Sequence, residues 1–318
     1  MATVSPPAVA LLSEDHLPRR PLAGTMWMGM GRRPGRVVSR LPAGGWRRAE
    51  QGSVGPLTFE VRPSADRLAF QVWGPAATPA DEAERALVAA RHWAGLDDDP
   101  TGFSDLVSTS PTLRGAVARL GVPILGRLPR AAESFGRAVI GQLVQGLEAG
   151  RSTAQMIAMT GTKTPHGVWA YPTRLSLGST SAHRLRTCGI SLRSAAVLHR
   201  FTLAEQRFEQ LYASRRWDVL DRHIRQLPGA GIWTAAETRL YLGDPDAVSY
   251  GDYHIPALVG WALGDRTETD QAMEELLAPY APQRGRVIRL LERAAARGLV
   301  AGKPRRGPRQ ALSAHRYW

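Results

Sequence analysis

The sequence predicts an α+β protein in which a small β-rich N-terminal domain precedes an all-helical region built around a helix-hairpin-helix. Three observations support this fold class. Leu57–Val61 and Leu68–Trp73 flank an Arg-Pro-Ser-Ala-Asp turn, which predicts two neighbouring antiparallel strands. From residue 131 onward, apolar residues recur at helical spacing. Residues 226–237 then read Gln-Leu-Pro-Gly-Ala-Gly-Ile-Trp-Thr-Ala-Ala-Glu, a glycine-rich turn between two helical runs.

Four segments follow from these patterns. Residues 1–20 are expected to form a disordered leader, and residues 21–112 a β-rich domain that also contains helices. Residues 113–302 are the predicted helical region. Residues 303–318 form a basic tail, for which solvation and non-specific DNA contact are both open interpretations.

Within the N-terminal domain, Thr25–Met30 and Arg36–Leu41 are further strand candidates. A helix is predicted from Thr78 to Ala94, because a threonine cap, a proline at the first helical position and three acidic residues open it. The run from Asp97 to Asp99 stops that helix before a proline. It is interpreted as a solvated cap, because no second set of spaced ligands accompanies it.

The helical region opens with a predicted helix over Ala132–Gly150. Apolar residues recur there every four positions, at Phe135, Val139, Leu143 and Leu147. That stripe is interpreted as core. Gly141 is costly in the middle of a helix, so it marks either a packing notch or a place where a ligand approaches.

The hairpin at residues 227–231 is the clearest functional signal. Helical runs from Trp217 to Gln226 and from Ile232 onward flank it. Glycines allow backbone conformations closed to other residues, so amide N–H groups at the start of the second helix can point outward together and hold a phosphate. Such hairpins are common in DNA-binding proteins, so this motif indicates nucleic acid and leaves catalysis open. No cofactor is predicted, and a monovalent cation at the hairpin is the one ion left open.

Composition limits the partner and the compartment. The formal net charge is +13 and the sequence pI is near 10.9, which favours a polyanionic partner. The single cysteine, Cys188, excludes an internal disulfide framework, a multi-cysteine zinc site and a four-cysteine iron–sulfur cluster. No apolar run approaches the roughly 20 residues that span a bilayer. A cytoplasmic, nucleoid-associated bacterial protein with no membrane partner and no obligate protein partner is expected.

Three ordered motifs carry a family resemblance. Residues 135–144 read Phe-Gly-Arg-Ala-Val-Ile-Gly-Gln-Leu-Val, residues 227–235 read Leu-Pro-Gly-Ala-Gly-Ile-Trp-Thr-Ala, and residues 251–255 read Gly-Asp-Tyr-His-Ile. Together they resemble the helix-hairpin-helix DNA glycosylases, and within them the 3-methyladenine DNA glycosylase II branch. The resemblance spans residues 22–298. It implies a DNA-binding cleft between helical lobes, double-stranded DNA with damaged bases as the partner, and excision of alkylated purines in base excision repair.

The family motifs also imply roles for single residues. Asp252 matches the catalytic carboxylate, which stabilises positive charge on the sugar as the N-glycosidic bond breaks; a helix N-cap is the competing interpretation. Gln142 and Leu143 match the segment that fills the space left by a flipped base, with Leu143 as either the wedge or a plain core leucine. Four hairpin residues are expected DNA contacts: Leu227, Gly229, Gly231 and Thr234.

Trp233 occupies the position where bifunctional members of this superfamily place a lysine that forms a Schiff base. Because Lys163 and Lys303 are the only lysines, water is the expected nucleophile and the predicted enzyme is monofunctional. The predicted base pocket contains Trp233, Glu237 and Tyr253. Glu237 departs from the family pattern, in which aromatic side chains from this helix stack on the base.

The last helix departs in the same way, because the pair Leu291–Glu292 stands where relatives place a second aromatic residue. No partner acid is evident near Asp252, which suits cationic alkylated purines because they leave without protonation. His254 is interpreted as structural. Two alternatives stay open: a non-catalytic DNA-binding protein that kept the scaffold, and a glycosylase specialised for bulky adducts of a DNA-alkylating natural product.

Overall fold

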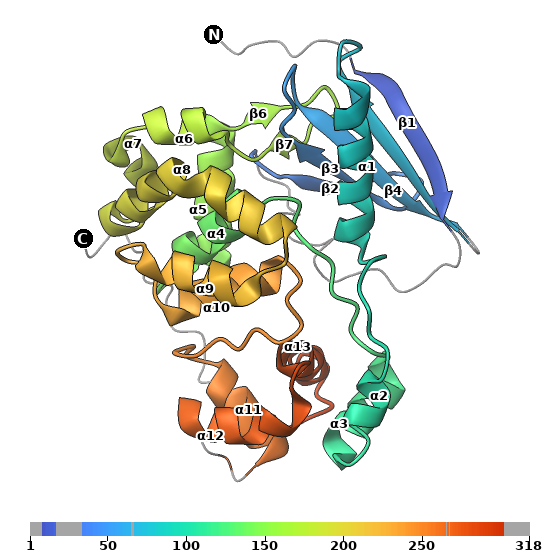
Figure 1. The fold of residues 1–318 in the computed structure, drawn as a ribbon, viewed down its shortest axis with the longest axis vertical. Helices are drawn as coiled ribbons and strands as arrows, with labels where there is room; N and C mark the ends of the chain where they lie inside the picture. The colour runs from blue at the N-terminus through green and yellow to red at the C-terminus, as the bar shows by residue number, and fades with distance from the viewer. Residues whose placement is uncertain (1–7, 17–33, 65–66, 265, 267, 302–318) are drawn as a thin grey trace.

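The computed structural model describes residues 8–16, 34–64, 67–264, 266 and 268–301. The strand candidate Thr25–Met30 and the basic tail lie outside these residues. The architecture is α+β, as predicted: a five-stranded antiparallel sheet precedes a region made mostly of helices (Figure 1). Among the helices within these residues, none is long and apolar enough to cross a membrane.

The sheet has the strand order β1-β5-β4-β3-β2. Its strands are β1 (Val9–His16), β2 (Val38–Arg40), β3 (Trp46–Glu50), β4 (Leu57–Pro63) and β5 (Leu68–Gly74). The expected pairing of the two segments around residue 64 is confirmed as β4 and β5, in register from Thr58 opposite Trp73 to Pro63 opposite Leu68. Helix α1 (Ala80–Ala94) lies across one face of the sheet (Figure 1).

The expected disordered leader is wrong for Val9–His16, which forms the edge strand β1. This strand pairs with β5 from Val9 opposite Gly74 to His16 opposite Leu68. Leu11 and Leu12 pack against the core, and Arg91 on α1 pairs with Glu14 at 3.2 Å. The segment is ordered because the sheet supplies hydrogen-bond partners that the local sequence does not reveal.

The remaining elements connect the sheet to the C-terminus. They are α2 (Phe103–Leu106), α3 (Pro111–Leu120), α4 (Ala131–Gly141), α5 (Gly146–Thr160), β6 (Thr162–Lys163), β7 (Trp169–Ala170), α6 (Arg174–Ser179), α7 (Ala182–Thr187), α8 (Leu192–Ala213), α9 (Trp217–Gln226), α10 (Ile232–Tyr241), α11 (Ile255–Leu263), α12 (Asp270–Leu277), the 3₁₀ turn η2 (Ala278–Tyr280) and α13 (Arg284–Ala295).

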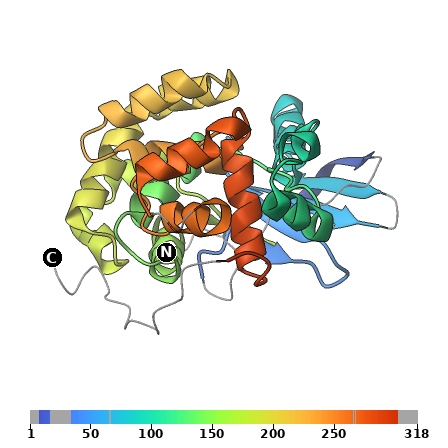
Figure 2. The same ribbon diagram turned by 90° about the horizontal axis from the view of Figure 1, so that it is seen from below.

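Two large hydrophobic cores hold most of the described elements, and a small third cluster joins Ala49 to Val168 and Ala170. The upper core joins the sheet, α1, α4, α5 and α8 to α10. The lower core joins α2 and α3 to α11, α12 and α13, and Figure 2 shows α3 beside the C-terminal helices. The expected domain boundary between residues 112 and 113 therefore falls inside α3. Leu113 and Ala116 bury their side chains in the lower core, so α3 belongs with the C-terminal helices in space.

The predicted helix over Ala132–Gly150 is interrupted. Helix α4 ends at Gly141 and α5 begins at Gly146. Phe135 and Val139 are buried as expected, whereas Leu143 is 97% exposed and has a φ of +58°. The apolar stripe is therefore core only up to the break.

A buried ion network joins the sheet to α4. Arg48 on β3 donates from Nε to Glu50 Oε1 at 2.8 Å and pairs through Nη2 with Glu133 on α4. Glu133 also accepts from Arg137 Nη2 at 2.7 Å. Burial raises the pKa of Glu50 to about 7, against the opposing charge of Arg48. The network holds α4, and hence the segment that follows it, against the sheet.

Candidate functional site

The hairpin between α9 and α10 forms as predicted and presents open backbone amides. Gly229 has a φ of +94°, and a Cβ there would lie 2.6 Å from the Val197 side chain, so only glycine fits this position. Gly231 is exposed, and a Cβ there would meet nothing within 4 Å. In the described part of the chain, the amides of Gly231 and Ile232 have no hydrogen-bond acceptor. The start of α10 can therefore receive an anion.

Gln142 ties the segment after α4 to this hairpin. Its Nε2 donates to the Gly229 carbonyl at 2.9 Å and to Thr234 Oγ1 at 2.7 Å. The expected DNA contact of Thr234 stays a prediction, although the residue is only 2% exposed. Thr234 faces the Gln142 amide because the first turn of α10 packs against α4.

Leu143 projects beside this junction, in the break between α4 and α5. Its 97% exposure excludes the interpretation as a core leucine. A positive φ at a branched residue costs on the order of 1–2 kcal/mol, so the backbone holds this leucine outward at an energetic cost. Gly141 ends α4, and a Cβ there would make only an ordinary contact of 3.4 Å with the Trp233 ring, so the structure does not decide between a packing notch and a place where a ligand approaches.

Asp252 lies in the loop before α11, and three N–H groups fix its carboxylate. Trp233 Nε1 donates to Oδ2 at 2.9 Å. The backbone amides of His254 and Ile255 donate to Oδ1 at 2.7 and 2.9 Å. Oδ1 therefore accepts from the amides at the start of α11, whose N-cap residue is His254, while Oδ2 is held by the first turn of α10.

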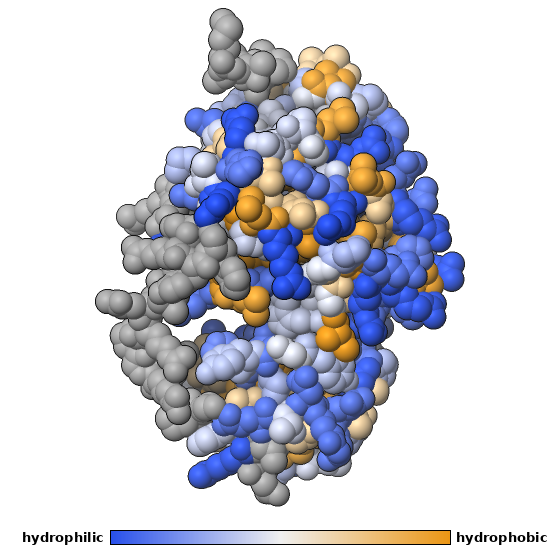
Figure 3. Space-filling model, turned by 90° about the vertical axis from the view of Figure 1, so that its left-hand side faces the viewer, coloured by the Kyte–Doolittle hydropathy of each residue, from blue (hydrophilic) through white to orange (hydrophobic). Residues whose placement is uncertain are grey.

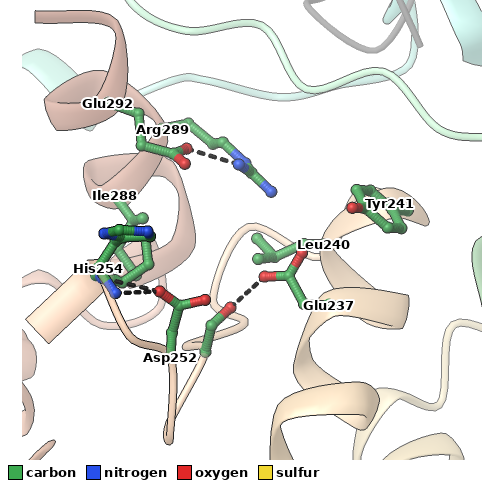
Figure 4. A pocket seen from close by; sticks show the side chains of 10 residues that line it. Glu237, Leu240, Tyr241, Asp252, His254, Ile288, Arg289 and Glu292 are labelled. Carbon is green, nitrogen blue, oxygen red and sulfur yellow. Dashed lines mark hydrogen bonds and ion pairs between the residues drawn. The ribbon is translucent and has the colours of Figure 1, made fainter. Parts of the chain in front are cut away.

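A cavity of about 250 Å³ opens beside Asp252. It lies between α10 of the upper core, the loop that carries Asp252, and α13 of the lower core (Figure 4). Its lining residues are Glu237, Leu240, Tyr241, Ser249, Asp252, His254, Ile255, Ile288, Arg289 and Glu292. On the face shown in Figure 3, hydrophilic residues predominate and the surface is indented between the upper and lower parts.

The cavity wall combines charged and polar groups with apolar side chains. Ser249 Oγ donates to Glu237 Oε1 at 2.6 Å, and Arg289 Nη1 donates to Glu292 Oε2 at 2.6 Å. Burial raises the pKa of Glu237, and the neighbouring Glu292 and Asp252 carboxylates raise it further, while Arg289 opposes them. Burial disfavours the Arg289 cation, but Glu292 and Glu237 outweigh it and raise the pKa of Arg289.

The three residues predicted for the base pocket lie in different places. Glu237 lines the cavity. Trp233 contacts Asp252 instead and is not among the lining residues. Tyr253 is 78% exposed and packs edge-on against the His254 ring, so it too lies outside the cavity. His254 does line it, because the chain is not helical between Asp252 and His254.

Sequence reasoning also missed several members of the site. Arg289 and Glu292 were not predicted to lie side by side in the site. Their spacing of three positions on α13 is the signal, because residues three apart share a helix face. Glu292 lines the cavity, while its neighbour Leu291 is fully buried in the lower core. The expected lack of an acid near Asp252 is wrong, because Glu237 shares its cavity.

Comparison with solved structures reveals the same fold in DNA glycosylases. The 3-methyladenine DNA glycosylase from Archaeoglobus fulgidus superposes with a TM-score of 0.67 and 19% identity, over 80% of this chain and 88% of that one. The 8-oxoguanine glycosylase/lyase of Clostridium acetobutylicum, in complex with double-stranded DNA containing cytosine opposite 8-oxoguanine, gives 0.61 and 12%, over 82% and 88%. No protein-family model and no curated protein matches the sequence. The predicted resemblance in fold is thereby confirmed.

Proposed function

We propose that this protein is a monofunctional DNA glycosylase, which flips alkylated purines out of double-stranded DNA and hydrolyses their N-glycosidic bonds in base excision repair. The observation that carries the proposal is the Asp252 carboxylate, fixed by three N–H groups at the edge of a cavity that charged and apolar side chains line together. Its location in the fold of known glycosylases supports a catalytic role.

The chemistry follows from that carboxylate. Breaking the bond between the sugar and the base develops positive charge on the sugar ring. A carboxylate already fixed beside the sugar stabilises this charge without having to reorganise. Asp252 is the proposed catalytic group, and water is the proposed nucleophile.

The hairpin and the wedge position the substrate. The open amides of Gly231 and Ile232 are proposed to bind a backbone phosphate next to the lesion. The exposed Leu143 is proposed to enter the duplex where the base has left, which lowers the cost of unstacking. Gln142, next to the wedge, donates to both Gly229 and Thr234 and so ties the wedge to the proposed phosphate site.

Two features support a monofunctional enzyme that acts on bases of ordinary size. By the family resemblance, Trp233 stands where bifunctional relatives place the Schiff-base lysine, and no lysine is among the residues that line the cavity. The cavity of about 250 Å³ is smaller than pockets for drug-sized ligands, which run from about 300 to 1,000 Å³. It therefore favours a single base over a bulky adduct.

The test is base release from methylated duplex DNA by the wild-type protein and by Asp252→Asn. We expect the wild type to release 3-methyladenine or 7-methylguanine, and the variant to be slower by about 10²-fold or more while still binding DNA. Undiminished release by Asp252→Asn refutes the catalytic assignment. DNA binding without release from any alkylated substrate favours a non-catalytic binding protein. A covalent complex trapped by borohydride refutes the monofunctional mechanism.

A further inference from the structure

We infer that Glu237 is a general acid that protonates the departing base, so that the enzyme also excises neutral purines. This inference rests on the proposed glycosylase function. It adds a second catalytic residue to that function.

The first support is geometric. Glu237 and Asp252 come from different elements, α10 and the loop before α11, and Figure 4 shows both side chains pointing toward one cavity. Ser249 is 1% exposed, and its hydroxyl holds Glu237 Oε1 at 2.6 Å. A base that enters the cavity while its sugar lies at Asp252 thus meets a second, separately anchored carboxyl group.

The second support is that the two carboxyl groups have different surroundings. Asp252 accepts three hydrogen bonds from N–H groups, the arrangement of an ionised, acceptor-only carboxylate. Glu237 lies where burial raises its pKa. Carboxyl groups placed in unlike environments commonly divide into acid and charge stabiliser. The charged or titratable groups around Glu237 are Tyr241 on its own helix, Asp252 and His254 on the loop side, and Arg289 and Glu292 on α13.

The proposed hydrolysis of the N-glycosidic bond needs no co-reactant other than water. As the bond between C1′ and the purine nitrogen breaks, its electron pair goes to the base, and the Glu237 proton moves to a ring nitrogen of that base. Water then adds to C1′ and releases a proton, which returns the Glu237 carboxylate to its acid form. A cationic alkylated purine leaves as a neutral molecule and does not need this proton, whereas a neutral purine does.

The experiment compares two duplexes, one carrying hypoxanthine as a neutral base and one carrying cationic 7-methylguanine, under single-turnover conditions. For Glu237→Gln we expect the ratio of hypoxanthine release to 7-methylguanine release to fall by about 10²- to 10⁴-fold. Glu275→Gln, the same substitution at an exposed site on α12, is the matched control, and its ratio should equal that of the wild type.

A pH profile gives an independent readout. Wild-type hypoxanthine release should decline as the pH rises through the pKa of Glu237, because only the protonated acid donates, and Glu237→Gln should lack this alkaline limb. The hydrogen bond from Ser249 lowers the pKa of Glu237, so Ser249→Ala should move the limb to higher pH.

The outcomes separate this inference from the proposed function. If the wild type releases 7-methylguanine but not hypoxanthine, or if Glu237→Gln slows both by the same factor, the acid role is overturned and the glycosylase proposal stands. If the wild type releases neither base, both the acid role of Glu237 and the proposed glycosylase function are refuted. Thermal unfolding of each variant shows whether a loss of rate reflects a loss of fold.

Discussion

Replacing Trp233 by phenylalanine removes one of the three hydrogen bonds that hold the Asp252 carboxylate. The indole Nε1 donates to Oδ2 at 2.9 Å, and it is the donor to that oxygen in the described structure. The two remaining bonds both go to Oδ1, from the amides of His254 and Ile255. After the substitution Oδ1 stays anchored, while Oδ2 can turn away from the sugar.

The expected loss follows from the strength of this bond. A hydrogen bond to a charged group contributes about 1.5–3 kcal/mol net, which corresponds to a rate factor of about 10 to 150. The smaller ring also leaves space against Gly141, where the indole now packs. We therefore expect slower chemistry together with a loss of about 1–3 kcal/mol in the free energy of unfolding.

Single-turnover release of 7-methylguanine at saturating enzyme measures the chemical step apart from DNA binding. Trp73→Phe on β5 is the matched control, because its indole N–H is buried with no hydrogen-bond partner among the described residues. That variant loses ring volume but no hydrogen bond, and its rate should stay near that of the wild type. A Trp233→Phe rate within about twofold of the wild type would show that the indole does not position Asp252.

Three further predictions concern the wedge, the hairpin and the ion network. Leu143→Ala should slow base release by on the order of 10-fold and leave the unfolding free energy almost unchanged, because the side chain is 97% exposed. Gly229→Ala should lower the free energy of unfolding by about 1–3 kcal/mol, since its φ is +94° and the new methyl meets Val197; Gly231→Ala, with open space at the Cβ, is the control and should stay within about 0.5 kcal/mol. Glu50→Gln should gain stability relative to the wild type as the pH rises from about 5 to 7, by about 1–3 kcal/mol. The pKa of Glu50 is raised from 4.5 to about 7, so the free energy of unfolding of the wild type falls across this window. Denaturant titrations at several pH values measure the free energy of unfolding of both proteins. Parallel pH profiles of the two proteins would contradict the prediction.

The sequence was sufficient to predict those structural features that depend on a local pattern of residues. Alternation around residue 64 predicts β4 and β5, and the glycine spacing of residues 227–231 predicts the hairpin. Asp252 could be named because it stands at a fixed place in an ordered motif. The strand pair and the hairpin depend on neighbouring residues, whose backbone preferences are set by the local sequence, whereas Asp252 was identified through the family resemblance.

Contacts between residues distant in sequence determine the order of strand β1 and the exposure of Leu143. Strand β1 is ordered by β5, nearly the full length of the sheet domain away in sequence. Leu143 continues an apolar helical repeat and yet is exposed, because Gln142 bonds to the hairpin where the helix would have continued. No local pattern encodes either outcome.

The same distinction holds for the site. The sequence by itself determined the α+β class, the hairpin and the candidate carboxylate. The family resemblance already placed Glu237 in the predicted base pocket, but only the tertiary structure added Arg289 and Glu292 to a cavity that Glu237 and Asp252 share, because a pocket between two hydrophobic cores forms only when both are packed. Whether a carboxyl group acts as acid or as charge stabiliser depends on burial and on neighbouring charge, and those exist only in the folded chain.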